Sequence, residues 1–526
     1  MQQLKPHDAS FLYSDTTHSN SNVSLLHIYD QSTAPGGVVR FKSILAHIAN
    51  RLDRAPLFRR RLQRVPLELD HPYWVEDENF DLEYHVRHIA LPKPGDWRQF
   101  CIQASRIHAR ALDLNRPLWE IYVIEGLDSF LDLPEGSFAL LVKTHRAAMD
   151  VQQAGELTRL LHDDTATPPV APPAPPWFPD SPPGRLAMAV RGAFNTASSP
   201  LRLAAPLARA AAQVVPAVLS LAGERLLRPD TSPVTRFNAV VSPHRVFDTR
   251  RFLVSECDEI RQLVRGASLV DVMLAVCGGA LRAYLDAQTE LPEASLSAIA
   301  PRSLQGNAPD DPAWLHVPLG TDLADPVQRL AAVHRHMQAS HKSVDKVTRA
   351  VGAKALAELG EQASAGTLSL SRKLIGRAAV SLGRHSPLAN CTITHVPGPA
   401  AAQFLCGARM TYDSAILPIA DGMGLVFALT VYDGRVVLSP TSCRELMPDP
   451  EAFAQAVRDS FQDYLALARR PAAPAKRSKA APRAAASAAA KQPQPAPRPA
   501  PKPAVKPLRA ARPPSGGRPS RPARSA

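Results

Sequence analysis

The residues best suited to chemistry lie in one short run, residues 143–151, which read Lys-Thr-His-Arg-Ala-Ala-Met-Asp-Val. His145 can take or give a proton near neutral pH, and Asp150 can order the loop that carries it. A histidine and an aspartate five residues apart are most often structural when nothing else accompanies them. The surrounding elements therefore decide what this pair does.

The run follows a predicted strand and precedes a predicted helix. Phe138–Val142 is wholly apolar, as expected of a buried strand, and Trp119–Ile124 predicts a second strand before it. Apolar residues then recur with helical spacing at 151, 154, 157 and 161. Residues 138–161 are therefore predicted to form a strand, a short loop and a helix, and loops at strand ends often carry catalytic side chains.

Several common catalytic signatures are missing from the sequence. It contains no Walker A loop, no Gly-x-Gly-x-x-Gly after a predicted strand, no His-Glu-x-x-His and no Gly-x-Ser-x-Gly. These absences disfavour nucleotide-dependent, zinc-protease and α/β-hydrolase functions.

Four other histidines have structural interpretations. His85 and His88 flank Arg87 in a predicted strand, where surface or inter-strand hydrogen bonds are expected. His334 and His336 lie on a predicted exposed helix, and no third ligand follows at a fitting spacing, so a metal site is not predicted.

Six further segments carry recognisable patterns: Asp8–Tyr13, Tyr84–Pro92, Arg116–Trp119, Asp271–Arg282, Val396–Pro399 and Asp421–Leu425. With residues 143–151 they resemble, in consistent order, the motifs of the bacterial wax ester synthase/diacylglycerol acyltransferase family. The resemblance runs from residue 4 to about residue 467. No single segment is specific, but the ordered set is.

The resemblance implies a fold class and a reaction. The fold would be α/β, with two halves like chloramphenicol acetyltransferase and a tunnel between them. Acyl-CoA would enter from one side and a fatty alcohol or diacylglycerol from the other, giving wax ester or triacylglycerol. In the family motif, H-H-x-x-x-D-G, the second histidine takes the hydroxyl proton as the oxygen attacks the thioester. No cofactor or metal is implied, because acyl-CoA is a substrate.

The motif of this chain departs from the family pattern at its centre. It reads H-R-x-x-x-D-V, so His145 matches the first histidine, Arg146 stands where the base should be, and Val151 replaces the glycine. Arginine has no accessible deprotonated form and cannot take the proton. His145 is one candidate for a substitute base. His395, at the asparagine position of the family's N-V-P-G-P turn, is the other.

Asp150 is expected to be structural rather than to transfer protons. A carboxylate at the start of a helix interacts favourably with the helix dipole and orders the loop. We expect a buried arginine as its ion-pair partner, with Arg282 and Arg302 as candidates. The second half departs from the family as well, since Val270-Asp271 stands in place of Asn-Asp.

Three functions remain open from the sequence. The first is an acyl-CoA-dependent O-acyltransferase that forms wax esters or triacylglycerol, with turnover reduced by the missing base. The second is a non-catalytic homologue that binds acyl-CoA or lipid, such as a carrier or a lipid-inclusion surface protein. The third is an interaction protein dominated by its C-terminal tail.

Composition divides the chain into four parts. Residues 1–165 are predicted as the first acyltransferase-like half, with the motif, and residues 236–470 as the second. Residues 166–235 join them through a proline-rich linker and an alanine-rich segment, 186–221. That segment predicts either a crossover helix packed on the protein or a basic surface for membrane lipid. Residues 471–526 form a tail that cannot build a core.

Periodicity predicts several further elements and a mixed α/β class. In the first half, residues 39–52 predict a helix with Lys42 and Arg51 on its outer side. The second half is predicted to contain a helix at Ser268–Leu285 and strands at Asn390–Val396, Gly424–Tyr432 and Val436–Ser439.

Positive charge is concentrated in the tail. The chain has a net charge of +13, and residues 471–526 contain 13 Lys and Arg but no Asp or Glu. Such a tail should remain disordered and bind polyanions. Anionic membranes or lipid inclusions are favoured over nucleic acid, and a solubilising extension is the simplest alternative.

Cysteine usage and hydropathy suggest a compartment. The six cysteines are far apart and form no Cys-x-x-Cys pair, as in a reducing cytosol. Met1–Pro6 is polar, and no run of 18 apolar residues occurs. We therefore expect a cytoplasmic protein, with any contact to the inner membrane or to lipid inclusions being peripheral.

Overall fold

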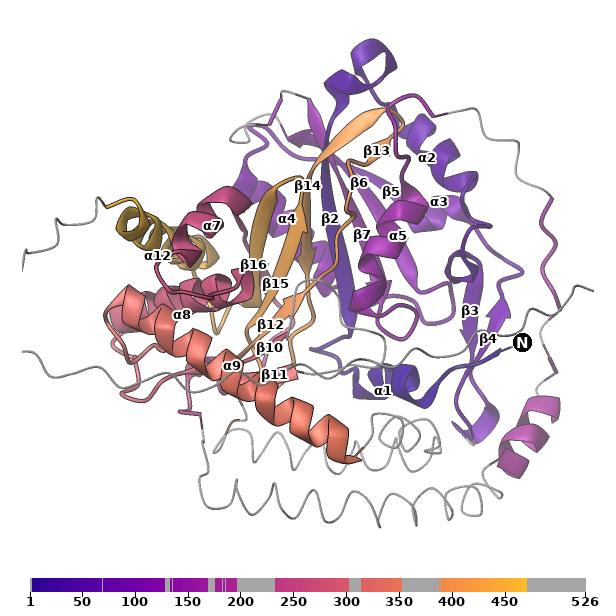
Figure 1. Cartoon of the computed structure of the whole chain (residues 1–526). Coiled ribbons are helices and arrows are strands. Elements are labelled where there is room, and N and C mark those ends of the chain that lie inside the picture. Colours follow the sequence, from indigo (N-terminus) through magenta and orange to yellow (C-terminus); the bar gives the residue numbers. More distant parts are fainter. Residues whose placement is uncertain are drawn as a thin grey trace, which may run out of the picture. The chain divides into compact units, whose positions relative to one another are not determined.

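The computed structural model describes residues 2–470 with several gaps (Figure 1). The gaps are residues 69, 128–132, 135, 169–175, 182, 185, 196–231, 302–313, 352–386 and 388. Four predictions therefore lie wholly or partly outside the described residues: the tail, part of the proline-rich linker, most of the alanine-rich segment, and Arg302. Within the described part, no helix has both the length and the apolar character needed to cross a membrane.

The first half alternates short helices and strands. Its helices are α1 (Pro6–Ser14), α2 (Phe41–Ala49), α3 (Leu82–His85), α4 (Trp97–Ala109) and α5 (Ala154–Leu161). Its strands are β1 (Gln2–Gln3), β2 (Asn22–Asp30), β3 (Arg60–Gln63), β4 (Tyr73–Glu76), β5 (Val86–Ala90), β6 (Trp119–Leu127) and β7 (Ser137–His145). The predicted strand, loop and helix of residues 138–161 correspond to β7, a turn and α5.

The second half is also mixed. Its helices are α7 (Val254–Arg261), α8 (Leu269–Ala287), α9 (Pro326–Val351) and α12 (Pro450–Ala468). Its strands are β8 (Arg245–Phe247), β9 (Arg250–Leu253), β10 (Ser297–Pro301), β11 (Trp314–Pro318), β12 (Cys391–His395), β13 (Phe404–Leu405), β14 (Ala408–Ile416), β15 (Val426–Tyr432) and β16 (Arg435–Cys443). In Figure 1 its helices lie together, with the strands between them and the first half.

Strand β7 lies in the middle of a six-stranded sheet of order β13-β14-β2-β7-β6-β5. Alternate side chains of β7 enter two different cores. Phe138, Leu140 and Val142 join the larger core together with apolar residues of α5, whereas Ala139 and Leu141 pack with α4. Burying each large apolar side chain contributes about 1.5–3 kcal/mol, so both faces hold the end of β7 firmly in place.

One strand of this sheet comes from the second half of the chain. Strand β14 pairs antiparallel with β2, bringing Asp413 opposite His27. The same strand reaches the second sheet through side chains, because Thr430 donates to the Asp413 carbonyl oxygen at 2.7 Å and Ser414 bonds Ser439 at 2.8 Å. The two halves are therefore joined through β14 and not only through the linker.

The second sheet has the order β11-β10-β12-β15-β16-β8, and β9 also pairs with β16. β12 runs parallel to both of its neighbours, β10 and β15. This arrangement ends β12 at His395 and sends the chain into the Pro397-Gly398-Pro399 turn. A third sheet, of order β1-β4-β3, lies in the first half.

One predicted helix face is wrong. Helix α2 ends at Ala49, and Arg51, predicted to face outward, is buried against Asp163. Its guanidinium also donates to the His47 carbonyl oxygen at 3.1 Å. The chain turns back after the helix, so helical spacing no longer decides which side Arg51 faces.

Candidate functional site

The motif occupies the turn between β7 and α5. Strand pairing fixes His145 opposite Asn22 at the end of β7. The next residue, Arg146, is held through its backbone N–H, which donates to the Ser21 carbonyl oxygen at 3.0 Å. Asp150 then stands before a short 3-10 turn, where its N–H donates to the Gln153 side-chain oxygen at 3.0 Å.

Both ring nitrogens of His145 are used inside the protein. Its Nδ1 accepts the backbone N–H of Ala147 at 3.0 Å, so the ring proton belongs on Nε2. That nitrogen donates to Asp15 Oδ2 at 2.9 Å, and the side chain is only 1% exposed. This geometry argues against the prediction that His145 replaces the missing base, because no lone pair faces a substrate.

Asp15 was not predicted, although it holds the motif histidine. Its Oδ1 accepts both the backbone N–H and the hydroxyl of Ser21 at 2.8 Å. The carboxylate therefore joins the loop after α1 to the end of β7. An acidic residue two positions after the Asp8–Tyr13 segment was the only signal in the sequence, and nothing local links it to His145.

Arg146 places a permanent positive charge at the position that the motif resemblance assigns to the base. Its guanidinium carbon lies 4.0 Å above the centre of the Phe11 ring, a favourable cation–π distance. Its Nη2 lies 4.0 Å from Asp150 Oδ1, and the Arg146 side chain is 30% exposed. This side chain can attract an anion, but it cannot accept a hydroxyl proton.

The predicted arginine partner of Asp150 needs correction. Arg282 donates to the Thr321 carbonyl oxygen at 2.6 Å, Arg302 lies outside the described residues, and among the described residues Asp150 pairs with Arg146. The Asp150 side chain is 46% exposed, so a buried arginine is not required to neutralise it. The carboxylate therefore lies at the protein surface rather than in the core.

His395 ends strand β12, opposite Leu429 on β15. Burial lowers the pKa of its imidazole to about 4, so the ring is neutral at pH 7. A neutral imidazole has a lone pair for a proton, although a base with so low a pKa is weak. The carbonyl oxygen of His395 accepts from Gln152 Nε2 at 3.3 Å, linking it to the turn that carries Asp150.

Two glycines allow the turns of the two halves to touch. A Cβ on Gly155 would lie 3.0 Å from the Pro397 carbonyl oxygen, tighter than nearly all real contacts. A Cβ on Gly398 would lie only 2.6 Å from Asp413 Oδ2. The start of α5, the Pro397–Pro399 turn and the crossing strand β14 therefore form one packed unit. A side chain at position 155 would press on the turn of the other half, and one at position 398 would displace the Asp413 carboxylate.

Two models of a single family match the chain in succession. The wax ester synthase/diacylglycerol acyltransferase catalytic domain matches residues 4–273, and the WS/DGAT C-terminal domain matches residues 312–464. The chain belongs to this family.

Relatives and solved structures agree with the assignment. Two putative diacylglycerol O-acyltransferases of Mycobacterium tuberculosis are 30% and 31% identical, covering 90% and 89% of this chain and 99% and 97% of their own lengths. The wax ester synthase/diacylglycerol acyltransferase from Marinobacter aquaeolei VT8 superposes with a TM-score of 0.63 at 23% identity, covering 89% of this chain and all of that one. A trichothecene 15-O-acetyltransferase from Fusarium sporotrichioides gives 0.53 at 10% identity, covering 89% of this chain and 95% of its own. The predicted family and α/β fold are confirmed.

Two buried polar pairs inside the scaffold were not predicted. Lys143, fully buried on β7, lies 3.4 Å from Glu120, and burial lowers its pKa to about 8. His27 lies 3.3 Å from Asp413 and 3.3 Å from the Thr158 hydroxyl. Both pairs join strands to their neighbours inside the scaffold, and neither reaches the exposed side of the motif.

Two of the environments predicted for the remaining histidines are wrong. His85 ends α3 rather than a strand; it is buried and bonds the Trp119 carbonyl oxygen at 2.7 Å. His334 does not project from an exposed face, because its Nδ1 lies 2.8 Å from the buried Asp271 carboxylate. His88 pairs with Glu125 at 3.1 Å, and His336 is exposed. Among the described residues, no cluster of three metal-binding side chains occurs.

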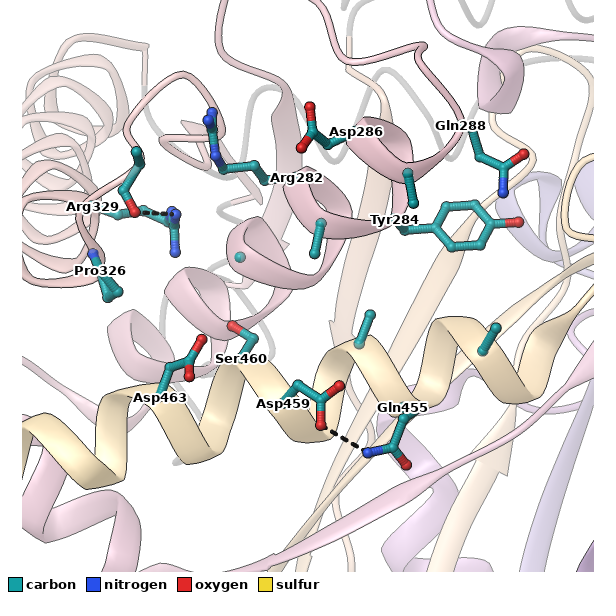
Figure 2. Close-up of a pocket in the computed structure, with 16 residues that line it drawn as sticks. Arg282, Tyr284, Asp286, Gln288, Pro326, Arg329, Gln455, Asp459, Ser460 and Asp463 are labelled. Carbon is teal, nitrogen blue, oxygen red and sulfur yellow. Dashed lines mark hydrogen bonds between the residues drawn. The ribbon is translucent and has the colours of Figure 1, made fainter.

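A cavity of about 560 Å³ opens between α8, α9 and α12, far along the chain from the motif (Figure 2). The two arginines that line it, Arg282 and Arg329, donate to backbone carbonyl oxygens. Three carboxylates also line it and would repel the phosphates of acyl-CoA: Asp286, Asp459 and Asp463. Another cavity, of about 530 Å³, lies at the end of α5. His145, Arg146, Asp150 and His395 line neither cavity, so the tunnel between the halves stays a prediction.

Proposed function

We propose that this chain transfers an acyl group from acyl-CoA to the hydroxyl oxygen of a fatty alcohol or of diacylglycerol, at a low rate. The observation that carries the proposal is the match of both family models, in order, to residues 4–273 and 312–464. The contact between Gln152 and His395, together with the packing of Gly155 against Pro397, supports a single site built from both halves.

The reaction needs an acceptor for one proton. The hydroxyl oxygen attacks the thioester carbonyl carbon, the carbon–sulfur bond breaks, and CoA leaves as a thiol once it receives the proton. Arg146 cannot carry that proton, and both nitrogens of His145 are engaged. His395 is neutral and is our candidate for the base. Its low pKa makes it a weak base, and loss of an efficient base typically costs about 100- to 10,000-fold in rate.

The test is direct product formation. Purified protein is incubated with labelled palmitoyl-CoA and either hexadecanol or diacylglycerol. We expect wax ester or triacylglycerol above a no-protein control, and we expect His395→Ala to remove it. Product formation that His395→Ala leaves unchanged would refute His395 as the base but not the acyltransferase function.

A second function is favoured by one observation, the cation at the base position. Arg146 stacks on Phe11 and lies near Asp150, which keeps a charged side chain where the family chemistry needs a neutral base. A carrier that binds acyl-CoA without turnover would tolerate this change. Saturable acyl-CoA binding with no product from either acceptor would support the carrier.

We also propose a peripheral, cytoplasmic location in which residues 471–526 bind anionic lipid. The 13 positive charges and absence of acids support this role, because basic segments bind anionic membranes in a salt-dependent way. Deleting residues 471–526 should weaken sedimentation with anionic vesicles at low salt and leave the melting temperature unchanged. Equal vesicle binding, or stronger binding to nucleic acid than to vesicles, would argue against the lipid role.

A further inference from the structure

A helix formed by residues 186–195 presents an apolar side to solvent. Leu186, Val190 and Phe194 are 79%, 63% and 66% exposed, and their spacing of four places them on one side of the helix. Phe178, shortly before the helix, is 83% exposed. Large apolar side chains exposed together on one element normally mark a binding surface.

The opposite side of this helix is anchored to the first half. Met188 is buried, and Asn195 donates to Asp70 Oδ2 at 2.7 Å. The Arg191 guanidinium carbon lies 5.7 Å from the ring centre of Tyr73 on β4. In Figure 1 the helix is the short magenta one at the edge of the molecule, beyond β3 and β4. Its orientation is thus fixed by specific contacts, and the apolar side is held outward.

The stretch of sequence that contains this helix is basic. Residues 181–229, which contain the helix, carry six arginines and a single acid, Glu224. Asp180 is the nearest exposed acid before them. Between the large apolar residues lie Ala187 and Ala193, which offer no side-chain hydrogen bonds to a protein partner. Apolar residues flanked by arginine suit the boundary between lipid headgroups and acyl chains.

We propose that helix 186–195, together with Phe178, docks this protein on an anionic lipid bilayer. The helix lies flat on the bilayer, with Leu186, Val190 and Phe194 among the acyl chains. Arg191, which is exposed at the border between this side and the anchored side, meets the lipid phosphates at the edge of the contact. This surface is separate from the motif, so the inference holds whether the protein turns over substrate or only binds it.

The test uses the full chain and vesicles of about 70% phosphatidylcholine and 30% phosphatidylglycerol in a flotation assay. The variant Val190→Glu/Phe194→Glu adds charge at exposed positions and should not alter folding, which an unchanged melting temperature verifies. We expect the partition coefficient to fall about tenfold or more, because burial of apolar surface in the bilayer is lost. The matched control is Val38→Glu/Leu253→Glu, which changes two exposed apolar residues elsewhere and should retain binding.

High salt distinguishes vesicle binding through the helix from vesicle binding through the basic tail. At about 0.5 M salt the Debye length falls to about 4 Å, so binding through the tail is screened while apolar insertion persists. The wild-type protein should keep part of its binding at this salt, and the double variant should lose it. Equal flotation of wild type and double variant would overturn the proposal. The proposal would also be overturned if the double variant lost self-association but kept vesicle binding. The apolar side of the helix would then bind a second copy of the protein instead of lipid.

Discussion

The two turns that meet at the junction of the halves differ in the group that each offers for chemistry. The turn between β7 and α5 carries Arg146, which is permanently charged and 30% exposed. The turn after β12 follows His395, whose imidazole is neutral because it is buried. The first turn therefore presents a charge to solvent, whereas the second follows a titratable ring that is shielded from solvent.

The contacts that hold these turns together are nevertheless present. Gln152 bonds the His395 carbonyl oxygen, and Gly155 lets α5 approach Pro397 closely. His145 is bonded to Asp15, which ties the turn to the loop after α1. Residues that hold the turns in place and residues proposed for the chemistry are therefore different, and mutations can test each group separately.

The largest effect should come from restoring a base. Arg146→His should raise acyl transfer by about tenfold or more, because a positioned imidazole near its usual pKa contributes orders of magnitude to proton transfer. Initial rates with palmitoyl-CoA and hexadecanol provide the measurement. Arg146→Gln is the control, since it removes the charge without supplying a base. Equal rates for the two variants would mean that substrates no longer reach this turn, and the carrier function would gain support.

The next largest effect is expected on stability, when acidic pH protonates His395. Its pKa is about 4 in the folded protein, against an ordinary value of 6.5, so the unfolded chain binds the proton more tightly. Stability from this group is therefore lost as pH falls from about 6.5 to 4, by up to about 3 kcal/mol. His395→Asn should lose less stability over this range than wild type in urea unfolding at pH 7, 5.5 and 4. Equal losses of unfolding free energy in wild type and His395→Asn would show that the His395 ring is hydrated.

A smaller effect is expected at the positioning carboxylate of the first turn. Asp15→Ala leaves the buried His145 Nε2–H and the Ser21 N–H without their acceptor, which should cost about 1–3 kcal/mol. Asp15→Asn keeps one acceptor oxygen and should cost less. Urea unfolding at pH 7 measures both. An unchanged free energy of unfolding for Asp15→Ala would mean that water replaces the carboxylate.

The smallest effect is expected at Asp150. Its carboxylate is nearly half exposed and lies 4.0 Å from Arg146, and exposed pairs contribute about 0–1 kcal/mol. Asp150→Ala should therefore lower the free energy of unfolding by less than Asp15→Ala does. A larger loss at Asp150 would reverse the assignment of the two carboxylates.

Local sequence patterns were enough to predict the strand before the motif and the helix after it. The apolar run 138–142 and the helical spacing after Asp150 predicted β7 and α5, because strand and helix periods are properties of neighbouring residues. The same approach was wrong for Arg51, His85 and His334. Each lies where the chain turns or where another element packs on it, and helical or strand spacing carries no information about that neighbour.

The sequence by itself determined the family and the presence at position 146 of a side chain that cannot accept a proton. These follow from residue types and their spacing, since arginine keeps its charge in any surroundings. The tertiary structure alone decided that Asp15 engages His145, that β14 crosses into the first sheet, and that burial keeps His395 neutral. The reason is physical: partners distant in sequence and the loss of water around a side chain both arise only when separate segments pack together.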